Sequence, residues 1–150
     1  MSLVTDRITY VIKNDYRKKR EMMNKTFQVV VTKEVSYDAL WEAVWGSDGS
    51  GIVYWASKIR KPDGSDIDLW VKGDEQYSLL PNPQDFKVYD HEEEKWHLCS
   101  LEQLAKGYEI AMATNATHCG GCLTADLENA DECSGDQIIQ FAIFGELVYG

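Results

Sequence analysis

The pattern of hydrophobic and polar positions changes its period early in the chain. TFQVVVTKEV, from Thr26, is rich in β-branched and aromatic residues and sets Phe27, Val29 and Val31 on one face, which predicts a strand. Ser36 then offers an N-cap, and apolar residues follow at positions 37, 40, 41, 44 and 45, which is the spacing of one helical face. We therefore expect a strand that leads directly into a helix ending near Gly46.

Glycine and proline divide the middle of the chain. GSDGSG (46–51) has the composition of a turn, IVYWASKI (52–59) predicts a second strand, and KPDG (61–64) predicts a tight turn. From there to Gln84 the pattern is weak, and LWVK (69–72) is its one candidate strand.

An acidic run separates two strand-like stretches in FKVYDHEEEKWHLC (86–99), which predicts a β-hairpin. Phe86 and Val88 are expected to share a face with Trp96 and Leu98 of the return strand. On that pairing His97 faces solvent.

Two helix starts in the last third of the chain are built alike. CSLEQL and CSGDQI each place a serine three residues before a glutamine, Ser100 before Gln103 and Ser134 before Gln137, which is the spacing of a capping box. The closing run QIIQFAIFGELVYG is apolar nearly all round. We expect protein to enclose this last segment, with Gly145 allowing another element to approach its backbone.

Together these elements predict a single α+β domain at 26–150, in which antiparallel strands pack against one early helix and two C-terminal helices. A chain of 150 residues is long enough to bury a sizeable core without disulfide or metal links. Residues 1–25 are charged and weakly patterned, and we interpret them as an N-terminal extension of uncertain order. RKKR at 17–20 is interpreted as a solvated part of that extension.

Composition narrows the class of protein. Hydrophobic residues make up 44% of the chain and charged residues 27%, as in a globular domain, and no apolar run approaches the roughly 18 residues of a transmembrane helix. The formal charge of −10 argues against general nucleic-acid binding, which needs clustered lysine and arginine. Residues 1–25 show no export leader, so we expect a cytoplasmic protein that binds no membrane and whose four cysteines are thiols.

THCGGC at 117–122 is the stretch that could carry metal or redox chemistry. Cys119, Cys122 and Cys133, with His118 or the more distant Cys99, would supply the four ligands of a zinc site, but the usual second pair with its own short spacing is missing. A redox pair would stand at the start of a helix after a strand, whereas this pair follows a predicted helix. We interpret the stretch as a thiol-bearing loop and expect no cofactor, with a zinc- or thiol-dependent protein as the alternative.

No motif in the chain indicates catalysis. The histidines at 91, 97 and 118 have no neighbouring serine or cysteine arrangement typical of a triad, and no phosphate-binding G-x-x-x-x-G-K-[ST] occurs. Because triads are assembled in space, an enzyme with a site that the sequence does not reveal stays an alternative.

A small-ligand site is predicted beside the Gly/Ser turn, because glycines let backbone amides approach a ligand, aromatic rings stack on it and basic groups neutralise its charge. The residues concerned are Trp45, Gly49, Gly51, Tyr54, Trp55, Lys58 and Arg60, and a nucleotide is one candidate ligand. The competing interpretation places Trp41, Trp45 and one of the Tyr54–Trp55 pair in the core, and we favour it for these aromatic residues.

Two motifs resemble those of small proteins encoded by bacterial phages, prophages and other mobile elements. The first is a Gly-rich turn followed by a Tyr-Trp pair, here Gly49, Tyr54 and Trp55. The second is a final IIQ-aromatic-A-x-FGE run, here Asp136, Ile138, Ile139, Gln140, Phe141, Ala142, Phe144, Gly145 and Glu146. The resemblance covers about residues 26–150 and implies an accessory protein that binds a protein partner or a small ligand, with no established activity to carry over. The longer turn before Tyr54 and the Cys119-x-x-Cys122 pair depart from the family pattern.

Overall fold

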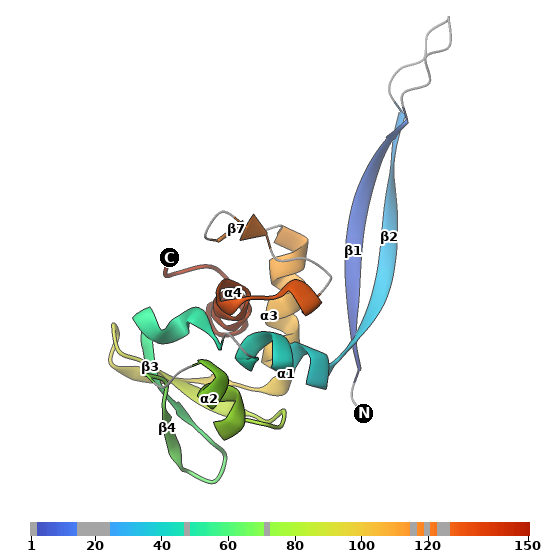
Figure 1. The fold of residues 1–150 in the computed structure, drawn as a ribbon. Coiled ribbons are helices and arrows are strands. Elements are labelled where there is room, and N and C mark those ends of the chain that lie inside the picture. Colours follow the sequence, from blue (N-terminus) through green and yellow to red (C-terminus); the bar gives the residue numbers. More distant parts are fainter. Residues whose placement is uncertain are drawn as a thin grey trace, which may run out of the picture.

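The strand expected from Thr26 and the helix expected after Ser36 both form. Strand β2 (Lys25–Ser36) leads directly into α1 (Tyr37–Trp45), and the Ser36 hydroxyl oxygen accepts a hydrogen bond from the Ala39 amide at 3.1 Å. Both are seen in a computed structural model, which describes residues 3–14, 25–46, 49–70, 73–114, 117–118, 121–122 and 127–150 (Figure 1).

The remaining elements lie on both sides of this pair along the chain. They are β1 (Leu3–Asn14), the 3-10 turn η1 (Gly51–Tyr54), β3 (Ala56–Arg60), β4 (Asp66–Asp68), α2 (Gly73–Leu79), β5 (Phe86–Asp90), β6 (Lys95–Cys99), α3 (Leu101–Thr114), β7 (Thr117–His118), β8 (Gly121–Cys122), the 3-10 turn η2 (Leu127–Asn129) and α4 (Glu132–Phe144).

A four-stranded antiparallel sheet and the helices α1 to α4 make the body of the described chain. The sheet has the strand order β4-β3-β5-β6, and one of its faces buries Ile59, Phe86 and Val88. Helices α3 and α4 pack on each other, and α4 also contacts α1 and β6 (Figure 1). This arrangement confirms the predicted single α+β domain.

Aromatic side chains fill the centre of the core. Trp41, Trp45 and Trp55 are at most 1% exposed, which confirms the core interpretation of these residues. The rings of Trp41 and Trp45 each meet the Phe86 ring edge-on, with centroids 5.6 Å apart. Tyr54, the neighbour of Trp55, keeps 43% of its surface exposed.

Helix α4 is enclosed as expected, with every residue from Ser134 to Phe141 buried, but the end of the closing run is not, since Gly145, Glu146, Val148 and Gly150 are exposed. The close approach of backbones occurs at Gly107 of α3, where a Cβ atom would lie 2.5 Å from the Ala142 amide nitrogen. The expectation for Gly145 was wrong: with φ at 74° it ends α4 in a left-handed conformation, and the space around it is open.

The two capping boxes turned out differently. At α3 the backbone amide of Gln103 donates to the Ser100 hydroxyl oxygen at 3.1 Å, and the backbone amide of Ser100 donates to the Gln103 side-chain oxygen at 2.9 Å. These two bonds confirm the predicted capping box. The start of α4 was misplaced. Asp131, not Ser134, is the N-cap, and Ser134 completes the box from the third helical position. An earlier aspartate competes for the same role, because both residue types cap well.

Three strand predictions need correction. Residues 51–54 form η1, so the strand expected at 52–59 starts at Ala56. LWVK contributes no described strand, since Leu69 and Trp70 lie in a turn after β4. The β5–β6 hairpin forms, but Phe86 pairs with Cys99 and Val88 with His97, so His97 faces inward while Leu98 is 55% exposed.

A long two-stranded ribbon, hereafter the arm, stands off the body (Figure 1). Its strands β1 and β2 pair over twelve residues each, from Leu3 opposite Ser36 to Asn14 opposite Lys25. At roughly 3.3 Å per residue the arm is about 40 Å long. No strand was predicted for 3–14, because charged and polar residues flank its β-branched and aromatic run ITYVI at 8–12.

Candidate functional site

The predicted ligand residues do not converge on one site. Gly51 packs against α4, where a Cβ atom would lie 2.8 Å from the Glu132 carbonyl oxygen. Lys58 and Arg60 alternate with the buried Ile59 on β3, so they lie on the opposite face of the sheet from the helices. The structure therefore separates the basic residues from the Gly/Ser turn.

The aromatic and basic members of the predicted site are also engaged elsewhere. Trp45 and Trp55 are fully buried and leave no ring face open to a ligand. Arg60 forms an ion pair with Asp66 at 2.7 Å, and its guanidinium lies 4.1 Å from the centre of the Trp96 ring. The pKa of Asp66 is lowered by this hydrogen bond from Arg60.

A groove does open beside the turn, between α1, η2 and the start of α4. Its volume is about 390 Å³, and its lining residues are Ala39, Glu42, Ala43, Gly46, Gly49, Leu127, Glu128, Ala130 and Asp131. Three of these residues carry carboxylates and none is basic, so the lining disfavours a phosphate-bearing ligand.

The two motifs that carry the family resemblance meet in one polar network. The fully buried Asp136 accepts hydrogen bonds from the Tyr54 hydroxyl at 2.7 Å, the Trp55 indole at 2.9 Å and the Gln140 amide at 2.8 Å. Gln140 also accepts from the amides of Val148 and Tyr149, at 2.9 Å each. This network holds η1 and the C-terminal tail on α4, so the motif residues have a structural role.

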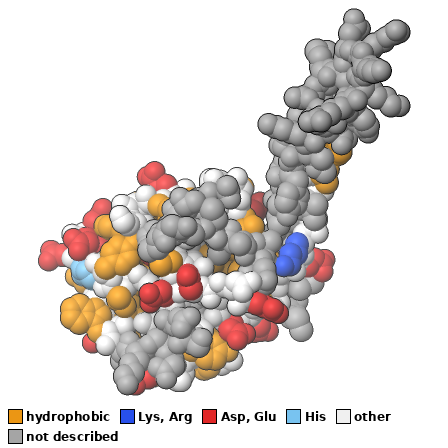
Figure 2. Space-filling model, turned by 45° about the horizontal axis from the view of Figure 1, so that its top comes forward, with side chains coloured by type: hydrophobic (Ala, Val, Ile, Leu, Met, Phe, Trp, Pro, Cys, Tyr) orange, Lys and Arg blue, Asp and Glu red, His pale blue; other side chains and the backbone are white. Residues whose placement is uncertain are grey.

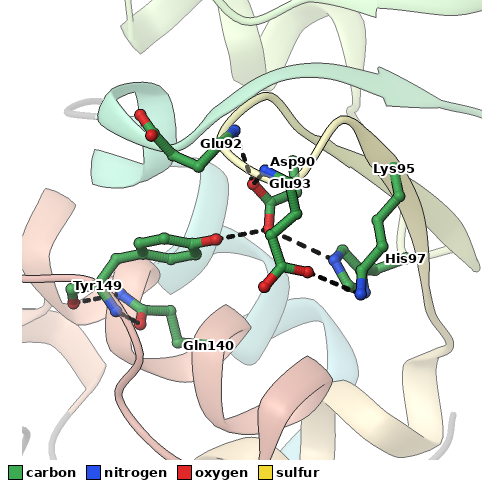
Figure 3. A network of polar contacts seen from close by, with 7 residues as sticks. All are labelled: Asp90, Glu92, Glu93, Lys95, His97, Gln140 and Tyr149. Carbon is green, nitrogen blue, oxygen red and sulfur yellow. Dashed lines mark hydrogen bonds and ion pairs between the residues drawn. The ribbon is translucent and has the colours of Figure 1, made fainter.

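A second polar cluster lies at the β5–β6 hairpin (Figure 3). Asp90 ends β5, Glu93 lies in the turn and His97 lies on β6, and one potential ligand atom from each is within 4.8 Å of the others. Asp90 is fully buried, and the Tyr149 hydroxyl donates to its Oδ2 atom at 2.8 Å. We call Asp90, Glu93 and His97 the hairpin cluster.

Two side chains beside the hairpin cluster, Tyr149 and Lys95, have raised pKa values. Burial and the hydrogen bond to Asp90 raise the pKa of Tyr149, so its hydroxyl stays protonated and donates. The Lys95 ammonium lies 2.7 Å from Glu93 Oε2, which raises the pKa of Lys95. Carboxylate and imidazole atoms at this spacing are groups that could hold a divalent cation.

Sequence reasoning missed the hairpin cluster. His97 was assigned to the solvent face, and Asp90 was counted as part of the acidic loop. A four-residue turn at 91–94 pairs Asp90 with Lys95 and Val88 with His97. A hairpin predicted with that turn would have placed Asp90 and His97 on the inner face.

The predicted zinc ligands lie mostly outside the described residues. Cys119 is not described, and His118 and Cys122 are described only as backbone of the short strands β7 and β8. Cys133 is partly buried near the start of α4. Cys99 lies in the core, where burial raises the pKa of its thiol. The zinc hypothesis stays a prediction.

Comparison with known proteins assigns this chain to no family. A scan against models of known protein families finds no match, and searches of curated proteins and of solved structures find none either. In the part of the chain that the structure describes, no helix has the length and apolarity needed to span a membrane.

Proposed function

We propose that the protein is an accessory protein of a bacterial phage, prophage or other mobile element, and that it binds a protein partner in the cytoplasm through its arm. The proposed origin rests on the two resemblance motifs. Because Tyr54, Trp55, Asp136 and Gln140 hold the body together, these motifs are accounted for by folding. We therefore assign binding to the arm, which lies outside the body.

The observation that carries the proposal is the exposure of the arm. Phe27 is 48% exposed and Val30 is 60% exposed, and they project from opposite faces of β2 because their positions differ by an odd number. The arm meets the body at its foot, where Val35 is 5% exposed, and β1 also contacts α3. An isolated two-stranded ribbon is marginally stable in water, so a partner that covers these residues would stabilise it.

The edges of the arm offer a second means of binding. Among the described residues β1 and β2 form a sheet of their own, so each strand has one edge without a neighbouring strand. An exposed edge presents a row of amide and carbonyl groups that a strand of another protein can pair with. Pairing of this kind provides main-chain hydrogen bonds, and Phe27 and Val30 would provide apolar contacts.

Charge is distributed unevenly between the arm and the body. The two strands of the arm, 3–14 and 25–36, contain four Lys or Arg and two Asp or Glu, a formal +2, whereas residues 37–150 contain seven and 21, a formal −14. Acidic side chains are spread over the face of the body shown in Figure 2, and a basic patch visible there lies at the foot of the arm beside an acidic one. A weakly basic, partly apolar arm fits a partner protein with an acidic surface.

Site-specific photocrosslinking in the bacterial host tests the proposal. A photoreactive amino acid is placed at position 30 in the arm or, as the matched control, at position 98, because Val30 and Leu98 are both about half exposed or more, at 60% and 55%. We expect a discrete adduct of higher mass from position 30 that survives nuclease, disappears on protease treatment and is absent from position 98.

Three results would contradict the proposal. An adduct at position 30 that nuclease removes would identify a nucleic acid as the partner. Adducts of equal yield at positions 30 and 98 would show that the arm has no special part in binding. A lack of any adduct from position 30 in cells that contain the folded protein would show that the arm binds nothing there.

A further inference from the structure

The hairpin cluster has the composition and geometry of a cation site. Its three side chains come from one hairpin, at the end of β5, in the turn and on β6, and they point toward one another (Figure 3). Asp90 pairs with Lys95 across the strands, which makes His97 the diagonal neighbour of Asp90 on the inner face. The spacing therefore follows from the hairpin register.

Asp90 is held in one orientation by its hydrogen bonds. Its Oδ1 atom accepts from the amides of Glu92 and Glu93, at 2.9 and 3.1 Å, and its Oδ2 atom accepts from the Tyr149 hydroxyl. A carboxylate has about four lone-pair positions. Three are used by these donors, and the remaining one is on Oδ2, the atom that His97 faces.

His97 presents an unused nitrogen to the same position. Its Nε2 atom is buried, has no hydrogen-bond partner among the described residues and lies 3.5 Å from Asp90 Oδ2, too long for a good hydrogen bond. The Phe144 ring meets the imidazole edge-on at 5.1 Å and supports its orientation. A buried nitrogen left without a partner is costly, and a shared cation would satisfy it together with the carboxylate.

The separation of the two atoms agrees with shared coordination. Two ligands that each lie about 2.1 Å from one ion are about 3.0–3.4 Å apart in octahedral or tetrahedral geometry. The observed 3.5 Å between His97 Nε2 and Asp90 Oδ2 is close to that range. Glu93 is half exposed, so its carboxylate can move toward the ion without disturbing the core.

We propose that Asp90, Glu93 and His97 bind a divalent transition-metal ion. One imidazole and two carboxylates suit Mn²⁺, Fe²⁺ or Zn²⁺ better than Ca²⁺ or Mg²⁺, which prefer oxygen ligands alone. The Lys95 ammonium, now beside Glu93, is 55% exposed and can withdraw into solvent when the ion binds. The proposed site uses none of the cysteines and does not depend on the proposed role of the arm.

Mn²⁺ binding to the full-length protein tests the proposal, since Mn²⁺ has little affinity for thiolates and will not report on the cysteines. Titration calorimetry and electron paramagnetic resonance are applied to the wild type, Glu93→Gln, His97→Gln and the control Glu92→Gln. Glu92 and Glu93 are neighbours with similar exposure, 56% and 50%, so the two variants make the same change of charge at adjacent positions.

One Mn²⁺ per chain is expected in the wild type and in Glu92→Gln, with nitrogen hyperfine coupling from an imidazole. Glu93→Gln should weaken binding at least tenfold, and His97→Gln should also abolish the nitrogen coupling. The proposal is wrong if no saturable binding occurs below about 1 mM, which corresponds to a very weak site. It is also wrong if Glu92→Gln and Glu93→Gln bind equally, or if the coupling persists in His97→Gln. Circular dichroism confirms that each variant is folded.

Discussion

Replacing Gln140 by leucine should destabilise the body more than the same change at Gln137. Both glutamines are at most 2% exposed on α4, less than one helical turn apart. Gln140 Oε1 accepts from the amides of Val148 and Tyr149, and its Nε2 donates to Asp136 and to the Tyr149 carbonyl oxygen. By contrast, Gln137 Oε1 is buried and has no hydrogen-bond partner among the described residues.

The difference in unfolding free energy follows from these partners. In Gln140→Leu the amides of Val148 and Tyr149, the Tyr149 carbonyl oxygen and Asp136 lose hydrogen bonds. Each is worth about 1–3 kcal/mol when its partner stays buried, although the groups of the tail can turn to water. We expect a net loss of about 2–4 kcal/mol, from a total of about 5–15 kcal/mol. Gln137→Leu removes an unsatisfied oxygen and should be neutral or stabilising by up to about 1 kcal/mol.

Urea denaturation followed by tryptophan fluorescence measures both variants, and Trp55 should report directly because its ring is stacked on that of Tyr149 at 5.2 Å. The melting temperature of Gln140→Leu should fall by roughly 5–15 °C, and that of Gln137→Leu should change little. Equal losses in the two variants would refute the reasoning, because they would show that volume at α4, and not hydrogen bonding to the tail, sets the cost.

Three other predictions test the core and its ionisable groups. Gly107→Ala should lower the free energy of unfolding by about 1–2 kcal/mol in urea, because the new Cβ meets the Ala142 backbone at 2.5 Å and overpacking exceeds the gain in helix propensity; an unchanged midpoint would contradict this. The pKa of Tyr149 is raised in the folded protein, so the stability that its hydroxyl contributes is complete below the ordinary tyrosine pKa of about 10 and is lost at higher pH. Between about pH 9 and pH 11 the melting temperature should therefore fall less in Tyr149→Phe than in the wild type. An equal fall would show that the interaction with Asp90 does not contribute. Cys99 should resist iodoacetamide at about pH 8 until urea is added, as seen by mass spectrometry, and rapid labelling of the native protein would place its thiol outside the core.

Local chemistry alone determined several features of this protein. The Ser36 cap, the box of Ser100 with Gln103 and the KPDG turn all form, because each depends on residues within four positions of one another. The enclosed last helix could also be predicted, since a segment that is apolar on nearly all sides must be covered by protein. The core tryptophans of α1 followed from their helical spacing in the same way.

The faces and partners of these elements were decided by the tertiary structure. The sequence pattern groups Phe86 with Val88 on β5 but leaves the register of β6 open, and the pairing of Val88 with His97 puts His97, and not Leu98, on the face that packs on the helices. This choice buries Asp90 beside His97 and leaves Leu98 exposed. The Gly/Ser turn and Lys58 are close in sequence, yet β3 puts them on opposite sides of the sheet. Contacts between distant segments, such as the hydrogen bond from Trp55 to Asp136 at 2.9 Å, cannot be predicted from the hydrophobic pattern. They depend on how whole elements pack together and not on the spacing of residues within any one element.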